Sequence, residues 1–185
     1  MKSGARVLGV AESYRGETST LAGAVVRADR AVDDLLFSTC TVGGSDATDA
    51  VADLVTALDR PDVPYLLVAG VAPAWFNLLD LPALHAAVDR PVVSVSFEAS
   101  PGLEEALRRE FDGEALAWRL DVYERQPPRR ELRVGADRLW VRAVGLDDDA
   151  VDELVCAFTP EGGRPEPLRV ARLAARAADR FRADS

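Results

Sequence analysis

Three carboxylates in this sequence could hold metal ions, because each follows a segment that is predicted to be a strand. Glu12 follows the apolar residues 7–10, and Asp46 and Asp49 follow residues 35–42. Carboxylate oxygens are the protein ligands that Mg²⁺ and Mn²⁺ prefer. Two such ions about 4 Å apart can activate water and stabilise a leaving oxygen in phosphodiester hydrolysis. We therefore predict Glu12, Asp46 and Asp49 as catalytic residues, with magnesium or manganese on Glu12 and Asp46.

The same carboxylates also have a purely structural interpretation. Asp46 can cap the helix that is predicted to follow it, and Asp49 would lie in the first helical turn, where the helix dipole favours negative charge. Glu12 could be an ordinary surface carboxylate. Both interpretations stay open at the level of the sequence.

Aromatic and amide side chains follow two of the predicted strands. Trp75 and Asn77 lie in the loop after residues 65–68, and Tyr14 lies just beyond the first strand. An aromatic ring at such a position can stack on a nucleic-acid base. We predict these three residues as nucleic-acid contacts, with packing in the core as the alternative for both rings.

Arginines concentrate in the last third of the chain. In the predicted final helix, Arg169, Arg172, Arg176 and Arg180 fall within about 80° of one another on a helical wheel. Such a stripe could grip phosphates through paired guanidinium hydrogen bonds. The alternative is a solvated face paired with nearby acids. A second cluster, within residues 125–133, contains four further arginines: Arg125, Arg129, Arg130 and Arg133.

The pattern of apolar residues predicts the elements that must position these groups. Residues rich in Val, Leu and Ile flanked by turn residues indicate strands, and apolar spacing of three or four indicates helices. Strands are predicted at residues 7–10, 21–27, 35–42, 65–68, 91–97, 120–123 and 139–144. Helices are predicted at residues 46–59, 81–88, 101–111, 147–158 and 165–181.

The order of these elements predicts an α/β fold in a single domain of residues 1–185. Three strands joined by short connections form an antiparallel meander, and right-handed crossovers make the next two strands parallel to the first. The result is a ribonuclease-H-like, mixed five-stranded sheet flanked by helices. A strand pair and two helices follow at the C-terminal side.

Three segments make the resemblance to a known family specific. They are residues 43–48 (GGSDAT), residues 69–77 (AGVAPAWFN) and residues 163–172 (GRPEPLRVAR). Together with the strand order, they resemble the endonuclease dU family over nearly the whole chain. That family is similar to endonuclease V, so the resemblance implies metal-dependent cleavage of deaminated, uracil-containing DNA, and hence a role in DNA repair.

The chain departs from the family pattern at three positions. Ala11 and Ala69 stand where the family has aspartate, and Arg172 stands where members commonly have histidine. An alanine cannot bind a cation, and ligand charge sets the affinity for Mg²⁺. Either the remaining carboxylates form a changed metal site, or the chain is an inactive nucleic-acid-binding or regulatory protein on the same fold.

The amino-acid composition indicates the kind of cell and the compartment in which the protein works. The chain has 31 acidic and 22 basic residues, net −9, and only one of the basic residues is lysine. A dense carboxylate surface stays soluble in strong salt, so we predict a halophilic archaeon as the source. The sequence has no long apolar run and no signal peptide, which predicts a cytoplasmic protein without a membrane partner. The family resemblance implies nucleic acid as the partner, DNA rather than RNA. The net charge of −9 does not exclude this partner, because local arginines can act where salt screens distant charges.

Overall fold

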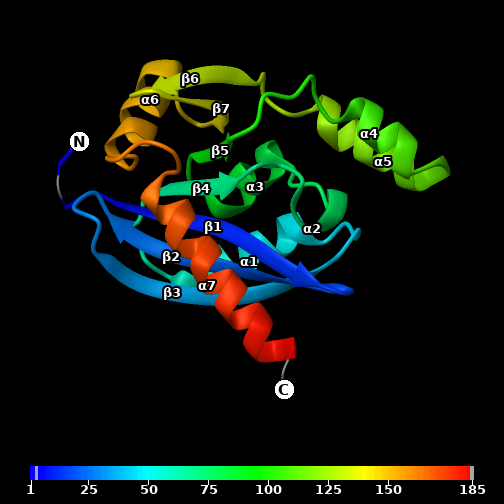
Figure 1. Cartoon of the computed structure of the whole chain (residues 1–185), viewed down its shortest axis with the longest axis horizontal. Helices are drawn as coiled ribbons and strands as arrows, with labels where there is room; N and C mark the ends of the chain where they lie inside the picture. The colour runs from blue at the N-terminus through cyan, green and yellow to red at the C-terminus, as the bar shows by residue number, and fades with distance from the viewer. Residues whose placement is uncertain (3, 184–185) are drawn as a thin grey trace.

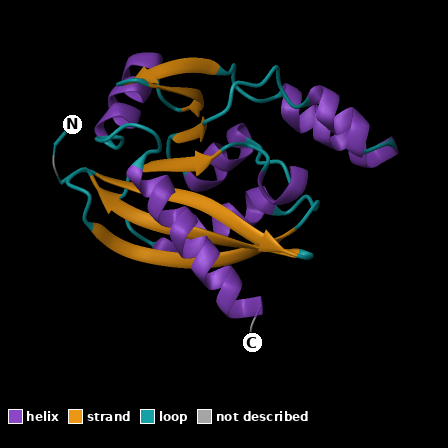
Figure 2. Cartoon of the chain, viewed as in Figure 1, coloured by secondary structure: helices purple, strands orange, loops and turns teal. Residues whose placement is uncertain are grey.

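The computed structural model describes residues 1–2 and 4–183, which form one seven-stranded mixed sheet with helices on both faces (Figures 1 and 2). The strand order is β3-β2-β1-β4-β5-β7-β6. The strands are β1 (Arg6–Arg15), β2 (Thr18–Arg27), β3 (Val32–Thr41), β4 (Tyr65–Ala69), β5 (Val92–Ser96), β6 (Arg130–Val134) and β7 (Asp137–Val144). The helices are α1 (Ala47–Leu58), α2 (Pro73–Phe76), α3 (Leu81–Val88), α4 (Glu104–Glu110), α5 (Gly113–Glu124), α6 (Asp148–Ala157) and α7 (Glu166–Ala183).

The predicted ribonuclease-H-like core is confirmed. Strands β1, β2 and β3 form the antiparallel meander, and β4 and β5 pair in parallel with β1 and with each other. The first strand is longer than predicted and continues to Arg15. Because parallel neighbours end at the same edge, β1, β4 and β5 direct their carboxyl ends to one side of the sheet.

Two predictions about the C-terminal part are wrong. Residues 120–123 lie in helix α5, because Leu116, Leu120 and Tyr123 repeat at helical spacing and pack in the cluster around Leu107 and Val122. The partner of β7 is instead β6, and this pair joins the main sheet through β7 and β5. The sheet therefore has seven strands rather than five strands and a separate pair.

The two faces of the sheet are covered by different helices. Even-numbered side chains of β1, such as Leu8 and Val10, pack with the apolar faces of α1 and α3. On the other face, Val7 packs in the core of α6 and the start of α7, and α7 runs across β1 and β2 (Figure 1). No helix in residues 1–2 and 4–183 combines the length and apolar character needed to cross a membrane.

Helix α7 approaches β1 at a glycine. A Cβ atom built on Gly9 would lie 2.4 Å from the carbonyl carbon of Pro167, which real Cβ contacts do not show. The backbones of β1 and α7 are therefore closer than any side chain at position 9 would allow. This contact sets the height of α7, and of its arginines, above the sheet.

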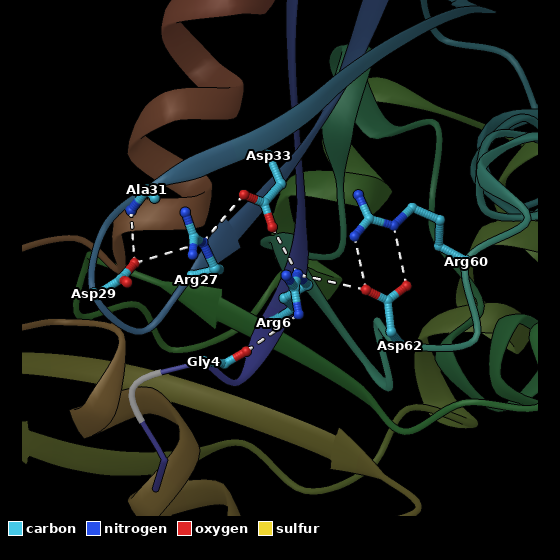
Figure 3. Close-up of polar contacts among 8 residues, drawn as sticks. All are labelled: Gly4, Arg6, Arg27, Asp29, Ala31, Asp33, Arg60 and Asp62. Atoms are coloured by element: carbon cyan, nitrogen blue, oxygen red, sulfur yellow. Dashed lines mark hydrogen bonds and ion pairs between the residues drawn. The ribbon is translucent and has the colours of Figure 1, made fainter.

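A network of ion pairs joins the amino end of β1 to the neighbouring hairpin (Figure 3). Asp33 accepts a hydrogen bond of 2.6 Å from Arg6 Nε and lies 3.1 Å from Arg27 Nε. Arg6 is also 3.4 Å from Asp62, which pairs with Arg60 at 2.7 Å. The hydrogen bond from Arg6 holds the pKa of the Asp33 carboxyl below its usual value, although partial burial opposes this, and the charge of Arg27 adds to it.

We expect Asp33→Asn to lower the melting temperature at neutral pH and to lose this effect in acid. A carboxyl whose pKa is lower in the folded protein stabilises the fold above its unfolded pKa of about 3.9. This contribution disappears as the pH falls through the folded value. Thermal unfolding of the wild type and the variant from pH 7 to pH 2.5, at fixed salt, checks this. The exposed Asp53→Asn serves as the control, and a wild-type-to-variant difference that stays constant over this range would contradict the prediction.

Candidate functional site

A small opening lies where β1 and β4 diverge at the carboxyl edge of the sheet. The last residues that pair between the two strands are Val10 and Val68. Beyond them, a space of about 40 Å³ is lined by Ala11, Glu12, Ala69 and Arg172, together with apolar side chains. The three positions at which the chain departs from the family pattern thus meet in one place, which we call the edge pocket.

The two alanines and Glu12 lie on opposite faces of the sheet. Ala11 and Ala69 face α7 and pack in the cluster that contains Ala171. Successive side chains of a strand alternate in direction, so Glu12 faces α1. There its carboxylate accepts a hydrogen bond of 2.8 Å from Ser19 Oγ on β2. Glu12 therefore does not replace a carboxylate at position 11, because its side chain leaves the strand in the other direction.

Asp46 lies just before α1, with both carboxylate oxygens engaged by neighbouring groups. Oδ1 accepts from Thr41 N at 3.0 Å and from Asn77 Nδ2 at 2.6 Å, and Oδ2 accepts from Thr41 Oγ1 at 2.9 Å. Burial of the carboxyl raises its pKa, but these hydrogen bonds outweigh that effect and lower it. Asp46 thus ties the end of β3 to the start of α1.

Asn77 is completely buried and joins three segments. Its Nδ2 donates to Thr41 O at 2.7 Å as well as to Asp46, and its Oδ1 accepts from Ala47 N at 2.9 Å. The last contact caps α1, since the Asp46 side chain makes no capping hydrogen bond. The predicted role of Asn77 as a nucleic-acid contact stays a prediction, and the structure gives it a positioning role within the fold.

We expect Asn77→Leu to lower the free energy of unfolding by about 2–4 kcal/mol. The leucine would leave the buried amide of Ala47 unpaired, at a cost of about 1–3 kcal/mol. The Thr41 carbonyl and the Asp46 carboxylate would each lose one hydrogen bond, at about 0.5–1.5 kcal/mol, although Gly44 N and Thr41 still donate to them. Urea unfolding followed by circular dichroism measures this. Thr56→Val, on the exposed side of α1, removes one hydroxyl hydrogen bond and should cost far less. Equal losses in the two variants would refute the capping role.

The thiol of Cys40 is buried within reach of the charges of Asp46 and Glu12. Burial first, and then the charges of Asp46 and Glu12, raise the pKa of Cys40 to about 11. Within residues 1–2 and 4–183, no three His, Cys, Asp or Glu side chains gather closely enough to hold a metal ion. The donors present therefore do not fit a two-metal centre, and the predicted pair Glu12 and Asp46 stays a prediction.

The remaining predicted residues differ in their surroundings. Asp49 and Tyr14 are exposed, in the first turn of α1 and at the end of β1. Trp75 is 43% exposed, and its ring packs 5.1 Å from that of Phe111 and against Gly43. The structure thus does not bring Tyr14, Asp49 and Trp75 into the edge pocket.

The arginines of α7 do not act as one stripe. Arg169 is paired with Glu166 at 2.6 Å. Arg176 is exposed, and its charge reaches Arg164 in the preceding loop. Arg172 lines the edge pocket and also a second, larger pocket. Of the four arginines in the predicted stripe, Arg172 is the one that the fold directs into the candidate site.

The larger pocket adjoins the edge pocket and was not predicted from the sequence. It has a volume of about 330 Å³ and shares Ala69 and Arg172 with its neighbour. We call it the arginine pocket, because four guanidinium groups line it: Arg129, Arg142, Arg164 and Arg172. The second arginine cluster of the sequence contributes only Arg129, since Arg125 and Arg130 pair with aspartates elsewhere. The alternation of Trp140 and Arg142 along β7 is the sequence signal that could have indicated this wall.

Comparison with known proteins gives the family that the chain matches and the solved structures that share its fold. The family described as endonuclease dU matches residues 3–179. A UPF0215 protein of Pyrobaculum aerophilum is 33% identical over 178 residues, which cover 94% of each chain. A protein of unknown function from Archaeoglobus fulgidus has a similar structure, with a TM-score of 0.83 and 25% identity over 94% of this chain and 97% of that one. Endonuclease V of Ciona intestinalis, solved with inosine-containing DNA, shares the fold at a TM-score of 0.62 and 13% identity, covering 94% and 85%.

Proposed function

The chain belongs to the endonuclease dU family, and we propose that it binds nucleic acid at the carboxyl edge of its sheet without two-metal hydrolysis. Family and fold support a nuclease as the general class of protein, and DNA-bound structural neighbours support nucleic acid as the partner. The proposal concerns what this chain does within that class. It rests on one observation, the meeting of Ala11, Ala69 and Arg172 in the edge pocket.

These three residues remove the negative charge that the family pattern places at the pocket, since the charges of Glu12 and Arg172 in the present lining cancel. Relative to the family pattern, two carboxylates are replaced by methyl groups and one guanidinium is added. The lining thereby becomes more positive by three unit charges if the family histidine is neutral. A cluster of carboxylates attracts divalent cations, whereas an arginine free to offer five N–H donors attracts phosphate oxygens. The edge pocket therefore disfavours a divalent cation, and Arg172 can donate to a phosphate oxygen at this edge of the sheet.

A second candidate function keeps the predicted catalysis. Glu12 accepts a hydrogen bond from Ser19, which pairs with Cys40 in the β2–β3 register. Asp46 accepts one from the next residue, Thr41, so the two carboxylates approach the same end of β3. In this case a magnesium or manganese ion would bind Glu12 and Asp46, with Asp49 nearby, and the substrate would be deaminated, uracil-containing DNA. The hydrogen bonds that already engage both carboxylates speak against this alternative.

One experiment distinguishes the two candidate functions. The purified protein is mixed with closed circular single-stranded DNA and with uracil-containing duplex DNA, in magnesium or manganese, at several salt concentrations. We expect salt-dependent binding of the circular strand, weakened at least tenfold by Arg172→Glu and much less by the control Arg138→Glu. We expect no cleavage above that of a Glu12→Ala, Asp46→Ala double variant. Metal-dependent cleavage well above that background would establish the nuclease and refute the proposal.

A further inference from the structure

The arginine pocket concentrates positive charge in an otherwise acidic protein. The chain carries 31 carboxylates, yet Glu98 is the one carboxylate among the lining residues, against four arginines. Within the part of the chain that the structure describes, Arg164 and Arg172 make no ion pair, whereas arginines such as Arg130 and Arg169 do. Burial, followed by the charges of Arg172 and Arg176, lowers the pKa of Arg164. The pocket thus holds like charges together without the counter-charge that the rest of the surface supplies.

Three of these guanidinium groups are held in place by aromatic rings. Arg164 lies 3.9 Å from the ring centre of Phe97, Arg129 lies 5.1 Å from that of Trp140, and Arg142 lies 5.4 Å from that of Tyr123. Stacking on a ring fixes the plane of a guanidinium and leaves its N–H edge free to donate. Arg129 and Arg142 donate some of these N–H groups to backbone carbonyls, whereas Arg164 donates to no backbone carbonyl within the described residues. Arg164 and Arg172 are therefore the two donors available to a ligand.

A buried hydroxyl adds a neutral donor to the same wall. Ser94 lines the pocket at 4% exposure and lies opposite Arg142 in the β5–β7 register. Among the described residues, its side chain has no hydrogen-bond partner. The enclosed, unpaired side-chain atoms of the described residues belong to Arg27, Arg90 and Gln126, so Ser94 Oγ is open to the pocket and can donate to a ligand there.

We infer that the arginine pocket binds the terminal phosphate of a nucleotide, carried on the end of a nucleic-acid strand. A phosphate monoester has three free oxygens and up to two negative charges, which match two unpaired guanidinium groups and one hydroxyl. The volume of about 330 Å³ lies at the lower end of the range for small-molecule sites, so it fits a single nucleotide and not a duplex. That the phosphate is carried on the end of a nucleic-acid strand rests on the proposed function, because the backbone next to that phosphate would lie at the adjacent edge pocket.

The test compares ligands that differ only in their ends. Fluorescence anisotropy measures the binding of a labelled 12-nucleotide thymidine strand with a phosphate or a hydroxyl at one end, in both polarities, and thymidine monophosphate and thymidine compete as free ligands. We expect one phosphorylated strand to bind about tenfold more tightly than its hydroxyl form, and the monophosphate to compete where thymidine does not. Arg164→Gln should abolish this preference. Arg138→Gln, which removes an exposed guanidinium on β7 outside the pocket, should retain it.

Each further outcome decides one of the two ideas. Equal binding of phosphorylated and hydroxyl ends, with no competition by the monophosphate, would overturn the inference. So would a preference that survives Arg164→Gln and Ser94→Ala together. Binding of the monophosphate without any binding of circular single-stranded DNA would uphold the phosphate pocket and refute the nucleic-acid role instead.

Discussion

Replacing Ala11 and Ala69 by aspartate, together with Arg172→His, should raise the affinity for Mn²⁺ by about 100-fold or more. The two alanines face α7 from adjacent strands and line the same opening, so two new carboxylates would converge there. The space of about 40 Å³ is enough for one water-sized group. Removing the guanidinium of Arg172 takes away the charge that would repel the ion. The edge pocket would thus regain the ligand charge that the family pattern places there.

Electron paramagnetic resonance of free Mn²⁺ measures this change directly. The matched control is Ala57→Asp with Ala177→Asp and Arg138→His, which makes the same change of charge at exposed positions on α1, α7 and β7. If the triple variant bound Mn²⁺ no better than this control, the edge pocket would not be the position of a former metal site. A gain in affinity together with cleavage of uracil-containing DNA would show that the two aspartates are what the wild type lacks.

Gly9→Val should lower the free energy of unfolding by about 3 kcal/mol and also weaken nucleic-acid binding. The new side chain would begin inside the backbone of Pro167, so α7 would have to move away from β1. Arg172 moves with that helix, which couples a packing change to the site. Gly4→Val is the matched control, because nothing lies within 4 Å of a Cβ at that position. Urea unfolding and binding to circular single-stranded DNA are measured on both variants, and equal results would contradict the role of Gly9.

Sequence patterns predicted the core of the fold because the core strands are uniformly apolar. The strand prediction for residues 120–123 was wrong because apolar and polar side chains alternate over Leu120, Asp121, Val122 and Tyr123 as in a strand. The helical spacing is visible only over a longer window that includes Leu116. Strand β6 was missed because three of its five residues are charged, as suits an edge strand. A short window cannot separate such a strand from a basic loop.

The sequence predicted the edge pocket better than the contacts around it. Positions 11, 69 and 172 were expected to matter through the family resemblance, and the fold brings them together. That Asp46 is engaged by Thr41 and Asn77 depends on how two loops approach one another, which local patterns do not contain. The arginine pocket is assembled from segments around residues 69–72, 94–103, 123–142 and 164–172, so no single motif marks it.

Helix α7 follows all seven strands in the chain, and it supplies Arg172 to both pockets. During synthesis on the ribosome, the N-terminal segments emerge and begin to fold first. The sheet can therefore form around its apolar core before Arg172, which both pockets share, has been translated. An incomplete copy that stops before Glu166 would lack the arginine that both pockets share, so it would carry neither pocket whole.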